Sequence, residues 1–520
     1  MRTGVDRICS AEEAVAAIAD GASIACSGFV GAGHPEALTA ALERRFLQTA
    51  GPTGLTLIYA AGQGDGQQRG LNHLAHEGLL RRVIGGHWGL CPELGRMALA
   101  GAIEAWNLPQ GVLCHLFREI AAGRPGLITD VGMGTFIDPL NGGGKLSNRC
   151  SEDLVERIEV RGKPFLLYHA FPITTALIRA TAADPWGNLI LEEEAVIGDV
   201  LPLAQAAHNH GGPVIAQVQR ISEEPFSPQR VRVPGRLVTH LVLSDPSEHW
   251  QTFGVQQDER FCAPALPRVT RTGFEGDLSS GVAGVACRDA RRIIAERACQ
   301  ELQPGSIVNL GIGLPEGIAE VARERGLLEQ VLLTLESGPL GGEPAQGLNF
   351  GAAYLPQAII DQPAQFDFYD GGGLDFAALG AAEVDQLGNV NVSRFGQRFA
   401  GVGGFVNISQ KARRLVFCGT LTTGGLDVRW DDSGLTILQE GRVSKFVRQV
   451  QQVSFSGQVA AQQQREVLYV TERAVFCLTA EGLQLLEIAP GIDLQRDVLD
   501  QMQFRPIIRD VKTMTLSGVG

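Results

Sequence analysis

Short apolar runs alternate along the chain with longer stretches in which apolar residues recur at helical spacing. The apolar runs cover residues 55–59, 165–168, 213–218, 237–243, 331–335, 414–418 and 466–470. Runs of this length that are rich in Val, Ile and Leu predict buried strands. Their alternation with helical patterns predicts α/β layers built on largely parallel sheets.

Two distant segments share the same order of predicted elements. Residues 11–42 and residues 290–325 each predict a helix, a strand, and a glycine loop that leads into another helix. The Gly-x-Pro-Glu sequence at 33–36 recurs at 313–316, and the Asp-x-x-Gly-Asn sequence at 184–188 recurs at 385–389. This repetition predicts a duplicated α/β unit. The first copy carries about 80 more residues between these markers, and they include 63–148.

The duplication divides the chain into two related open α/β domains. We predict an N-terminal domain over residues 1–258, a linker over 259–285 that contains Pro264, Pro267, Gly273 and Gly276, and a C-terminal domain over 286–520. The length of 520 residues fits such a division, since domains typically span about 100 to 200 residues.

Charge and hydropathy exclude several classes of function. The chain has 44 Lys and Arg against 57 Asp and Glu, a formal net charge of −13, and no basic run. Nucleic acid is therefore not an expected partner, because binding a phosphate backbone needs clustered cations. No apolar run approaches the roughly 18 residues of a membrane span, and the start has no apolar signal core. We expect a cytoplasmic protein whose ten cysteines are reduced thiols.

The sequence offers little support for several common catalytic motifs. All histidines lie between His34 and His249, so a histidine-based pair could come only from the first half. The pair His208 and His210 lacks neighbouring ligands, and we expect no metal. The glycine loop at 141–145 lacks the flanking residues of a phosphate loop, and no nucleophile elbow stands out.

The sequence VLLTLESGPLGG at 331–342 places a carboxylate directly after an apolar strand. Open α/β sheets bind ligands and place catalytic groups at the carboxyl ends of parallel strands. Glu336 could equally be a solvated strand end or a helix cap. The matching strand end of the first half, 59–62, contains no acid, and glycine is dense around 370–375 and 401–405. Such glycine density favours close approach to a ligand.

Several of these motifs together resemble one enzyme family. Glu336-Ser-Gly with Gly341-Gly342, the run 366–374, Gly388-Asn-Val-Asn391 and the run 401–408 are similar to the class I coenzyme A transferases. Further segments are similar to the same family. They are residues 28–36, 107–111 and 130–138 in the first half and residues 490–493 and 504–506 in the tail. The chain most resembles short-chain acetate and propionate CoA-transferases with fused halves. The resemblance implies a duplicated CoA-transferase (NagB-RpiA-like) fold with the active site between the two domains.

The resemblance also implies roles for individual residues. Glu336 would be the nucleophile, Gly404 would supply the backbone amide of the oxyanion hole, and Gln110 would supply a side-chain donor. The residues expected to contact CoA are Gly311, Gly313, Pro315, Asn389, Gly401 and Gly403. A glutamate titrates near pH ~4.3 and is ionised at neutral pH, so Glu336 needs no neighbouring base.

The implied reaction transfers CoA from an acetyl-, propionyl-, butyryl- or acetoacetyl-CoA to a free short-chain acid. It would be ping-pong and would run through a glutamyl-CoA thioester, with CoA as a substrate and without a metal or tightly bound cofactor. The resemblance implies a homo-oligomer, a dimer or a tetramer. The alternatives are an acyl-CoA hydrolase on the same scaffold, which would not depend on added acetate, and a non-catalytic or sugar-phosphate isomerase-like binding protein. The residues by themselves do not fix the acyl group.

Overall fold

The computed structural model describes residues 5–263, 289–431 and 433–516. By its internal contacts the chain divides into two compact units. Unit 1 consists of Met1–Pro264, Leu335–Gly371 and Ser393–Asn407, and unit 2 consists of Ala265–Thr334, Gly372–Val392 and Ile408–Gly520. Two segments from the second half of the sequence therefore belong with the first half, which differs from a single division at the predicted linker. Most of that linker, from residue 264 to residue 285, lies outside the described residues.

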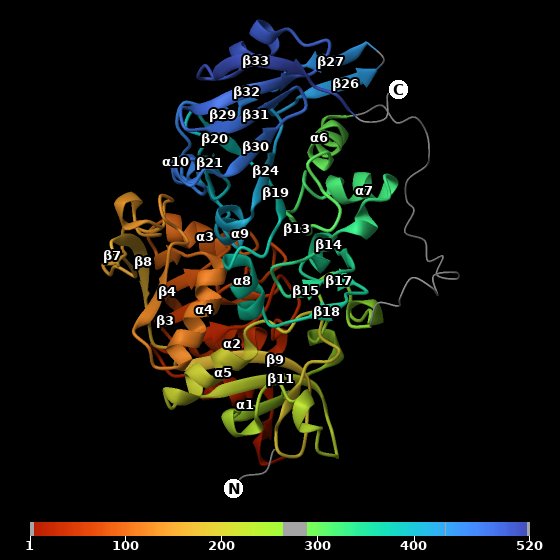
Figure 1. Ribbon diagram of the computed structural model, residues 1–520. Coiled ribbons are helices and arrows are strands. Elements are labelled where there is room, and N and C mark those ends of the chain that lie inside the picture. Colours follow the sequence, from red (N-terminus) through yellow and green to blue (C-terminus); the bar gives the residue numbers. More distant parts are fainter. Residues whose placement is uncertain (1–4, 264–288, 432, 517–520) are drawn as a thin grey trace. The chain divides into compact units, whose positions relative to one another are not determined.

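Unit 1 is built on one large sheet (Figure 1). Its strands follow the order β1 (Ile8–Cys9), β12 (His240–Leu243), β11 (Val214–Ile221), β9 (Thr175–Ala183), β2 (Ser23–Cys26), β3 (Leu55–Tyr59), β4 (Leu80–Gly85) and β5 (Glu104–Asn107). Neighbouring strands in this order are parallel, and β10 (Leu189–Ile190) pairs antiparallel with β9. Every residue of β9 is buried, as expected for a strand covered on both faces of a parallel sheet.

Helices and smaller strands complete unit 1. The helices are α1 (Ala11–Ala16), α2 (Glu36–Thr49), α3 (Pro92–Leu99), α4 (Gln110–Ala121), α5 (Val200–Asn209) and α8 (Gln362–Asp370). The smaller strands are β6 (Gly126–Thr129), β7 (Val155–Val160), β8 (Lys163–His169), β15 (Pro339–Leu340), β16 (Glu343–Pro344), β17 (Ala353–Tyr354), β18 (Ala358–Ile359), β22 (Arg394–Phe395) and β23 (Arg398–Phe399). Buried residues of α1, α2 and α3 share one hydrophobic cluster with β2 and β3. Helix α4 packs against α5 and α8.

Unit 2 is built on a sheet of order β14 (Leu332–Leu333), β13 (Ile307–Leu310), β19 (Phe376–Gly380), β24 (Arg414–Cys418), β30 (Glu466–Val470), β31 (Ala474–Thr479), β32 (Gly482–Ile488) and β33 (Ile507–Thr513). The strands from β14 to β30 are parallel, and β31 is antiparallel to both of its neighbours. Its helices are α6 (Ala290–Cys299), α7 (Gly317–Glu324) and α10 (Gly457–Gln462), and α9 (Phe405–Lys411) crosses the boundary between the units. The smaller strands are β20 (Glu383–Asp385), β21 (Val390–Asn391), β25 (Thr422–Thr423), β26 (Asp427–Asp431), β27 (Gly434–Gln439), β28 (Val443–Ser444) and β29 (Phe446–Val447).

The predicted duplication is visible in the strand order of the two sheets. Unit 1 contains β3-β2-β9-β11-β12, and unit 2 contains β14-β13-β19-β24-β30, both parallel throughout. In each unit the helix that precedes the first strand of the repeat begins with a side-chain cap. Ser10 caps α1, which precedes β2, and Asp289 caps α6, which precedes β13. The additional residues of the first half form β4, α3, β5 and α4, and the two strands extend the sheet beyond β3. The α/β class predicted from the sequence is confirmed.

The repeated Asp-x-x-Gly-Asn sequences form the same turn in both units. Asp184 accepts hydrogen bonds from the Asn188 backbone N–H at 2.9 Å and side chain at 2.9 Å. Asp385 accepts the equivalent bonds from Asn389 at 3.1 and 3.0 Å. Among the described helices, none combines the length and the apolar character that crossing a membrane requires.

Candidate active site

Glu336 lies in a tight turn that follows β14. The Leu335 N–H donates to the Pro339 carbonyl at 3.0 Å, and the Gly338 N–H donates to the Leu335 carbonyl at 3.1 Å. Gly338 has a φ of +123°, and a Cβ there would lie 2.1 Å from the Ile360 carbonyl oxygen. The turn therefore requires glycine at this position. Glu336 itself is half-buried.

The neighbouring Ser337 fixes the turn to the rest of unit 1. Its side chain is fully buried, and Oγ donates to the Gly351 carbonyl at 2.5 Å. Gly351 in turn contacts Phe29 of the first half, because a Cβ on Gly351 would lie 2.3 Å from the Phe29 ring. Gly351 thus connects the turn that carries Glu336 to the glycine loop that follows β2.

Gly404 belongs to a glycine loop that precedes α9. The Gly403 N–H donates to the Gly86 carbonyl at 2.7 Å, and the Gly403 carbonyl accepts from the Gln110 N–H at 2.9 Å. Gly401 and Gly403 have φ values of +77° and +51°. A Cβ on Gly401 would lie 2.9 Å from the Trp88 ring. Glycine at 401 is therefore needed for both backbone conformation and packing.

Gln110 is the first residue of α4 and is 2% exposed. Its side-chain Oε1 lies beside Gly403, since a Cβ on Gly403 would be 3.5 Å from that atom. Within the described part of the chain, the Gln110 Nε2 group is buried and has no hydrogen-bond partner. A buried amide without a partner is costly and uncommon, so this donor is suited to an oxygen atom of a bound substrate.

Asn107 and Asn407 hold these loops together, and sequence reasoning did not assign them a role. Asn107 Nδ2 donates to the Gly85 and Gly86 carbonyls at 2.9 and 2.5 Å, and its Oδ1 accepts from the Val402 N–H at 3.1 Å. Asn407 Oδ1 accepts from the Gly111 N–H at 3.1 Å. Asn107 lies within the 107–111 motif, so its position in that motif was the available signal.

His87 is a third residue that sequence reasoning did not single out. A Cβ on Gly403 would lie 3.6 Å from the His87 Cβ, and a Cβ on Gly62 would lie 2.6 Å from its Nδ1. Burial lowers the pKa of His87 to about 4. Its imidazole is therefore neutral at neutral pH and adds no charge beside Gly403.

The remaining residues predicted to contact CoA lie in unit 2. The Gly311 N–H donates to the Ala378 carbonyl at 2.8 Å, and Gly313 has a φ of +86°. Helix α7 begins at Gly317, so Pro315 lies in the preceding turn. The Asn389 side chain donates to Asp385 and accepts from the Gly457 N–H at 2.9 Å. These hydrogen bonds stabilise the turn at 385–389. Contact of these four residues with CoA stays a prediction.

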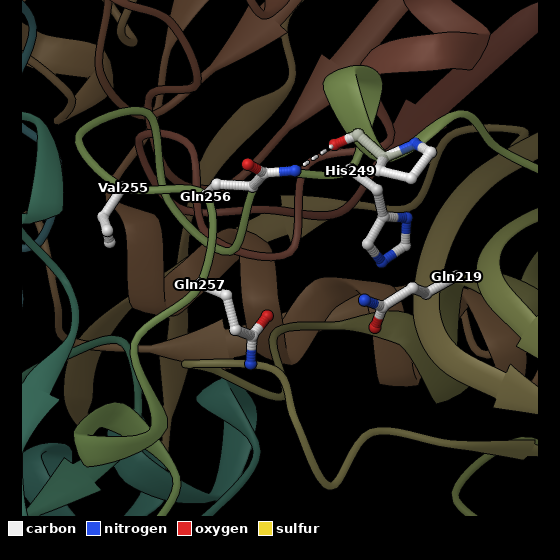
Figure 2. Close-up of a pocket in the computed structure, with 6 residues that line it drawn as sticks. Gln219, His249, Val255, Gln256 and Gln257 are labelled. Carbon is white, nitrogen blue, oxygen red and sulfur yellow. Dashed lines mark hydrogen bonds between the residues drawn. The ribbon is translucent and has the colours of Figure 1, made fainter.

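A cavity of about 230 Å³ in unit 1 contains none of the predicted site residues (Figure 2). It is lined by Gln219, Pro246, His249, Val255, Gln256 and Gln257. His249 contacts Ser244 at 2.9 Å and Glu194 at 3.2 Å, and Glu194 forms a buried ion pair with Arg179 at 2.9 Å. Arg179 and His249 hold the pKa of Glu194 at about 2 despite its burial. We interpret this network as structural.

Glu336 and Gly404 from the second half of the sequence, and Gln110 from the first half, therefore all belong to unit 1. These three residues contain a carboxylate, a glycine backbone amide and an amide donor without a partner among the described residues. These are the chemical groups that nucleophilic acyl transfer with stabilisation of an oxyanion requires.

Comparison with known proteins identifies the family. Residues 8–244 match the family model described as Coenzyme A transferase. The chain is 43% identical over 504 residues to acetate CoA-transferase YdiF of Escherichia coli K12, covering 96% of this chain and 92% of the relative. It is 42% identical over 515 residues to the caffeate CoA-transferase of Acetobacterium woodii, covering 97% and 96%.

Solved structures agree with the sequence comparison. The crystal structure of the acyl-CoA transferase YdiF apoenzyme from Escherichia coli O157:H7 superposes with a TM-score of 0.89 at 41% identity, covering 98% of this chain and 95% of that chain. The same enzyme solved as a thioester complex with CoA gives the same TM-score, identity and coverage. The chain therefore belongs to the coenzyme A transferase family and is a CoA-transferase.

Proposed function

We propose that the protein transfers CoA between a short-chain acyl-CoA and a free short-chain carboxylate, through a glutamyl-CoA thioester formed on Glu336. The names of the two similar enzymes, an acetate and a caffeate CoA-transferase, support carboxylic acids as substrates. The thioester complex of the solved relative supports a covalent thioester step. The observation that carries the proposal is the buried Gln110 side chain in the same unit as Glu336: its Oε1 lies beside Gly403, and its Nε2 has no partner among the described residues.

The first half-reaction moves CoA onto the enzyme. The Glu336 carboxylate attacks the thioester carbonyl, the C–S bond breaks, and CoA leaves as a thiolate from an acyl-glutamyl anhydride. The thiolate then attacks the glutamyl carbonyl of the anhydride, which releases the free carboxylate and leaves glutamyl-CoA. The second half-reaction reverses these steps with another carboxylate.

Each tetrahedral intermediate on this path carries a negative oxygen. The Gly404 N–H and the Gln110 Nε2 group are the proposed donors to it. One well-placed donor of this kind typically contributes about 3 to 4 kcal/mol of transition-state stabilisation. Gly404 has no Cβ, so a substrate oxygen can approach its N–H closely.

Isotope exchange tests whether CoA transfer depends on Glu336. The enzyme is incubated with unlabelled acetyl-CoA and ¹⁴C-acetate, with no other acid present. A glutamyl-CoA intermediate predicts that label enters acetyl-CoA, and that Glu336→Gln abolishes this exchange. Glu343→Gln, which removes a nearby half-buried carboxylate, is the matched control and should exchange.

The same assay separates transfer from hydrolysis. A hydrolase would release free CoA steadily without acetate and would not incorporate label into acetyl-CoA. Exchange by Glu336→Gln at the wild-type rate would rule out Glu336 as the nucleophile.

A further inference from the structure

Several buried polar side-chain atoms in unit 1 have no hydrogen-bond partner among the described residues. Gln362 and Gln365 of α8 are both 0% exposed. In the described residues, neither the oxygen nor the nitrogen of either amide has a partner, and the same holds for Asp199 Oδ1 and Gln110 Nε2. Buried polar atoms are nearly always paired with protein or ordered water. Six such atoms in one unit therefore indicate an occupant, either water or a ligand.

Backbone contacts place these four side chains in one region. The Gln362 N–H donates to the carbonyl of Gly198 at 3.2 Å, next to Asp199. Burial, the largest cause, and the Asp199 carboxyl both raise the pKa of the Cys114 thiol, and Cys114 lies one helical turn after Gln110 on α4. Helix α8 packs against the start of α4, because a Cβ on Gly111 would lie 2.4 Å from the Phe366 ring. We call Gln110, Asp199, Gln362 and Gln365 the buried amide cluster.

The cluster adjoins the turn that carries Glu336. The Ile360 N–H donates to the Gly338 carbonyl at 3.1 Å. Gly338 is two residues after Glu336, and Ile360 is two residues before Gln362. The Ile360–Gly338 hydrogen bond therefore connects the segment before Gln362 to the turn of the proposed nucleophile, and Gln110 of the cluster is itself a proposed oxyanion donor.

The chemistry of the cluster selects a particular kind of group. Each glutamine amide can both donate and accept a hydrogen bond. Burial raises the pKa of Asp199 to about 7, so a protonated fraction adds a further donor near neutral pH. None of the four side chains is basic. An uncharged oxygen group could form hydrogen bonds with these side chains, whereas a second carboxylate would meet the Asp199 carboxyl and find no cation among the four.

We propose that the buried amide cluster is a recognition site for acyl chains longer than acetyl, and that among these it selects acids bearing a hydroxyl or oxo group on the chain. The proposal rests on the function proposed above and narrows its substrate class. Sites built to hydrogen-bond a substrate oxygen reject analogues lacking it by about 10⁴ to 10⁵, because the buried polar groups are then left unpaired. A purely apolar pocket separates acyl chains by only about 10 to 200-fold per methylene.

The test compares acyl donors of equal chain length. The kcat/KM values for acetoacetyl-CoA, 3-hydroxybutyryl-CoA and butyryl-CoA are measured with saturating acetate. Wild type is expected to prefer at least one oxygenated donor over butyryl-CoA by about 100-fold or more, and to use succinyl-CoA poorly. Gln362→Leu and Gln365→Leu, singly and together, are expected to reduce this ratio to below about tenfold.

A matched control separates recognition from general damage. Gln251 is also fully buried, but its Nε2 donates to the Glu193 carbonyl at 2.7 Å and its Oε1 accepts from the Asp258 N–H at 2.8 Å. Gln251→Leu should lower thermal stability and leave the donor ratio unchanged. Gln362→Leu and Gln365→Leu should melt no earlier than wild type, because they remove amides that form no hydrogen bonds to any described residue.

The proposal would be overturned if wild type used the oxygenated donors and butyryl-CoA with similar kcat/KM values. It would also be overturned if the two Leu variants left the ratio of these values unchanged. Water would then be the occupant of the cluster. Failure of the underlying function has a different signature. In that case no acyl-CoA would support label exchange through Glu336, whatever oxygen its chain carries.

Discussion

The side-chain amide of Gln110 should contribute to kcat and not to stability. Gln110→Leu removes the unpaired Nε2 donor and keeps a side chain of similar size. Because one oxyanion donor is worth about 10² to 10³ in rate, kcat should fall by that factor. Steady-state kinetics with acetyl-CoA should show little change in KM. The melting temperature should not fall, since no described group loses a bond to Nε2; parallel losses of kcat and stability would contradict the assigned role.

His34 predicts a pH dependence of stability. Burial lowers its pKa to about 4, from an ordinary value of 6.5, while Nδ1 contacts Gln63 at 2.7 Å and Nε2 contacts Thr39 at 3.0 Å. Between these two pH values the unfolded chain binds the proton and the folded chain does not. The free energy of unfolding should therefore fall as the pH drops from about 6.5 to 4, by about 3 kcal/mol from this residue.

Urea unfolding at pH 7.5, 6.0 and 5.0 measures this effect. His87 and His249 also have lowered pKa values and contribute to the wild-type slope in the same direction. The change in the free energy of unfolding with pH is compared between wild type and His34→Gln, and the difference is the contribution of His34. The variant should lose less stability on acidification. Equal slopes for the two proteins would mean that His34 is protonated in the folded state.

Asn107 shows how an element end can position a site. It stands at the end of β5 and joins Gly85, Gly86 and Val402 through three hydrogen bonds. Asn107→Ala should lower the free energy of unfolding by about 2 kcal/mol. It should also lower kcat at least tenfold, because Val402 and Gly86 fix the loop that contains Gly403.

Asn188→Ala is the matched control for that variant. It removes hydrogen bonds to Asp184 and Gly235 in a turn that contains none of the proposed site residues. Chemical unfolding and steady-state kinetics should show lost stability with kcat unchanged. Equal effects of the two variants on kcat would show that Asn107 acts only through stability.

Two helical glycines should respond oppositely to alanine. A Cβ on Gly111 in α4 would lie 2.4 Å from the Phe366 ring and 2.5 Å from Asn407 Nδ2. Gly111→Ala should therefore destabilise the protein, by about 1 to 3 kcal/mol through overpacking. At Gly95 in α3 the nearest atom would be 3.6 Å away, so Gly95→Ala should gain up to about 1 kcal/mol of helix propensity. Thermal unfolding of both variants measures the contrast, and a shift of the same sign in both would contradict it.

Apolar runs predicted the existence of several strands but not their ends. The run at 331–335 becomes β14 over Leu332–Leu333 only, because the Leu335 N–H bonds to Pro339 in the turn rather than to the sheet. The central strand β9 produced no apolar run, since it is rich in Ala and Thr and contains Arg179. Its burial depends on close packing of small side chains and on the pairing of Arg179 with Glu194, which local sequence does not reveal.

At the scale of the whole molecule, internal repetition was the strongest sequence signal. The repeated Gly-x-Pro-Glu and Asp-x-x-Gly-Asn sequences predicted duplication, and the shared strand order confirms it. The sequence did not reveal that 335–371 and 393–407 belong with the first half, because that depends on long-range contacts such as Gly351 with Phe29. Gln362 and Gln365 were missed for the same reason, since only packing shows that both amides are buried.

Covalent capture of CoA on Glu336 is the central claim. Intact mass is measured after wild type and Glu336→Ala are incubated with acetyl-CoA alone, and again after treatment with acetate or borohydride. The account predicts an adduct equal to CoA minus water on wild type only, discharged by acetate and removed by borohydride. An adduct of the same mass on Glu336→Ala, or no adduct on wild type while free CoA accumulates, would contradict the proposed mechanism.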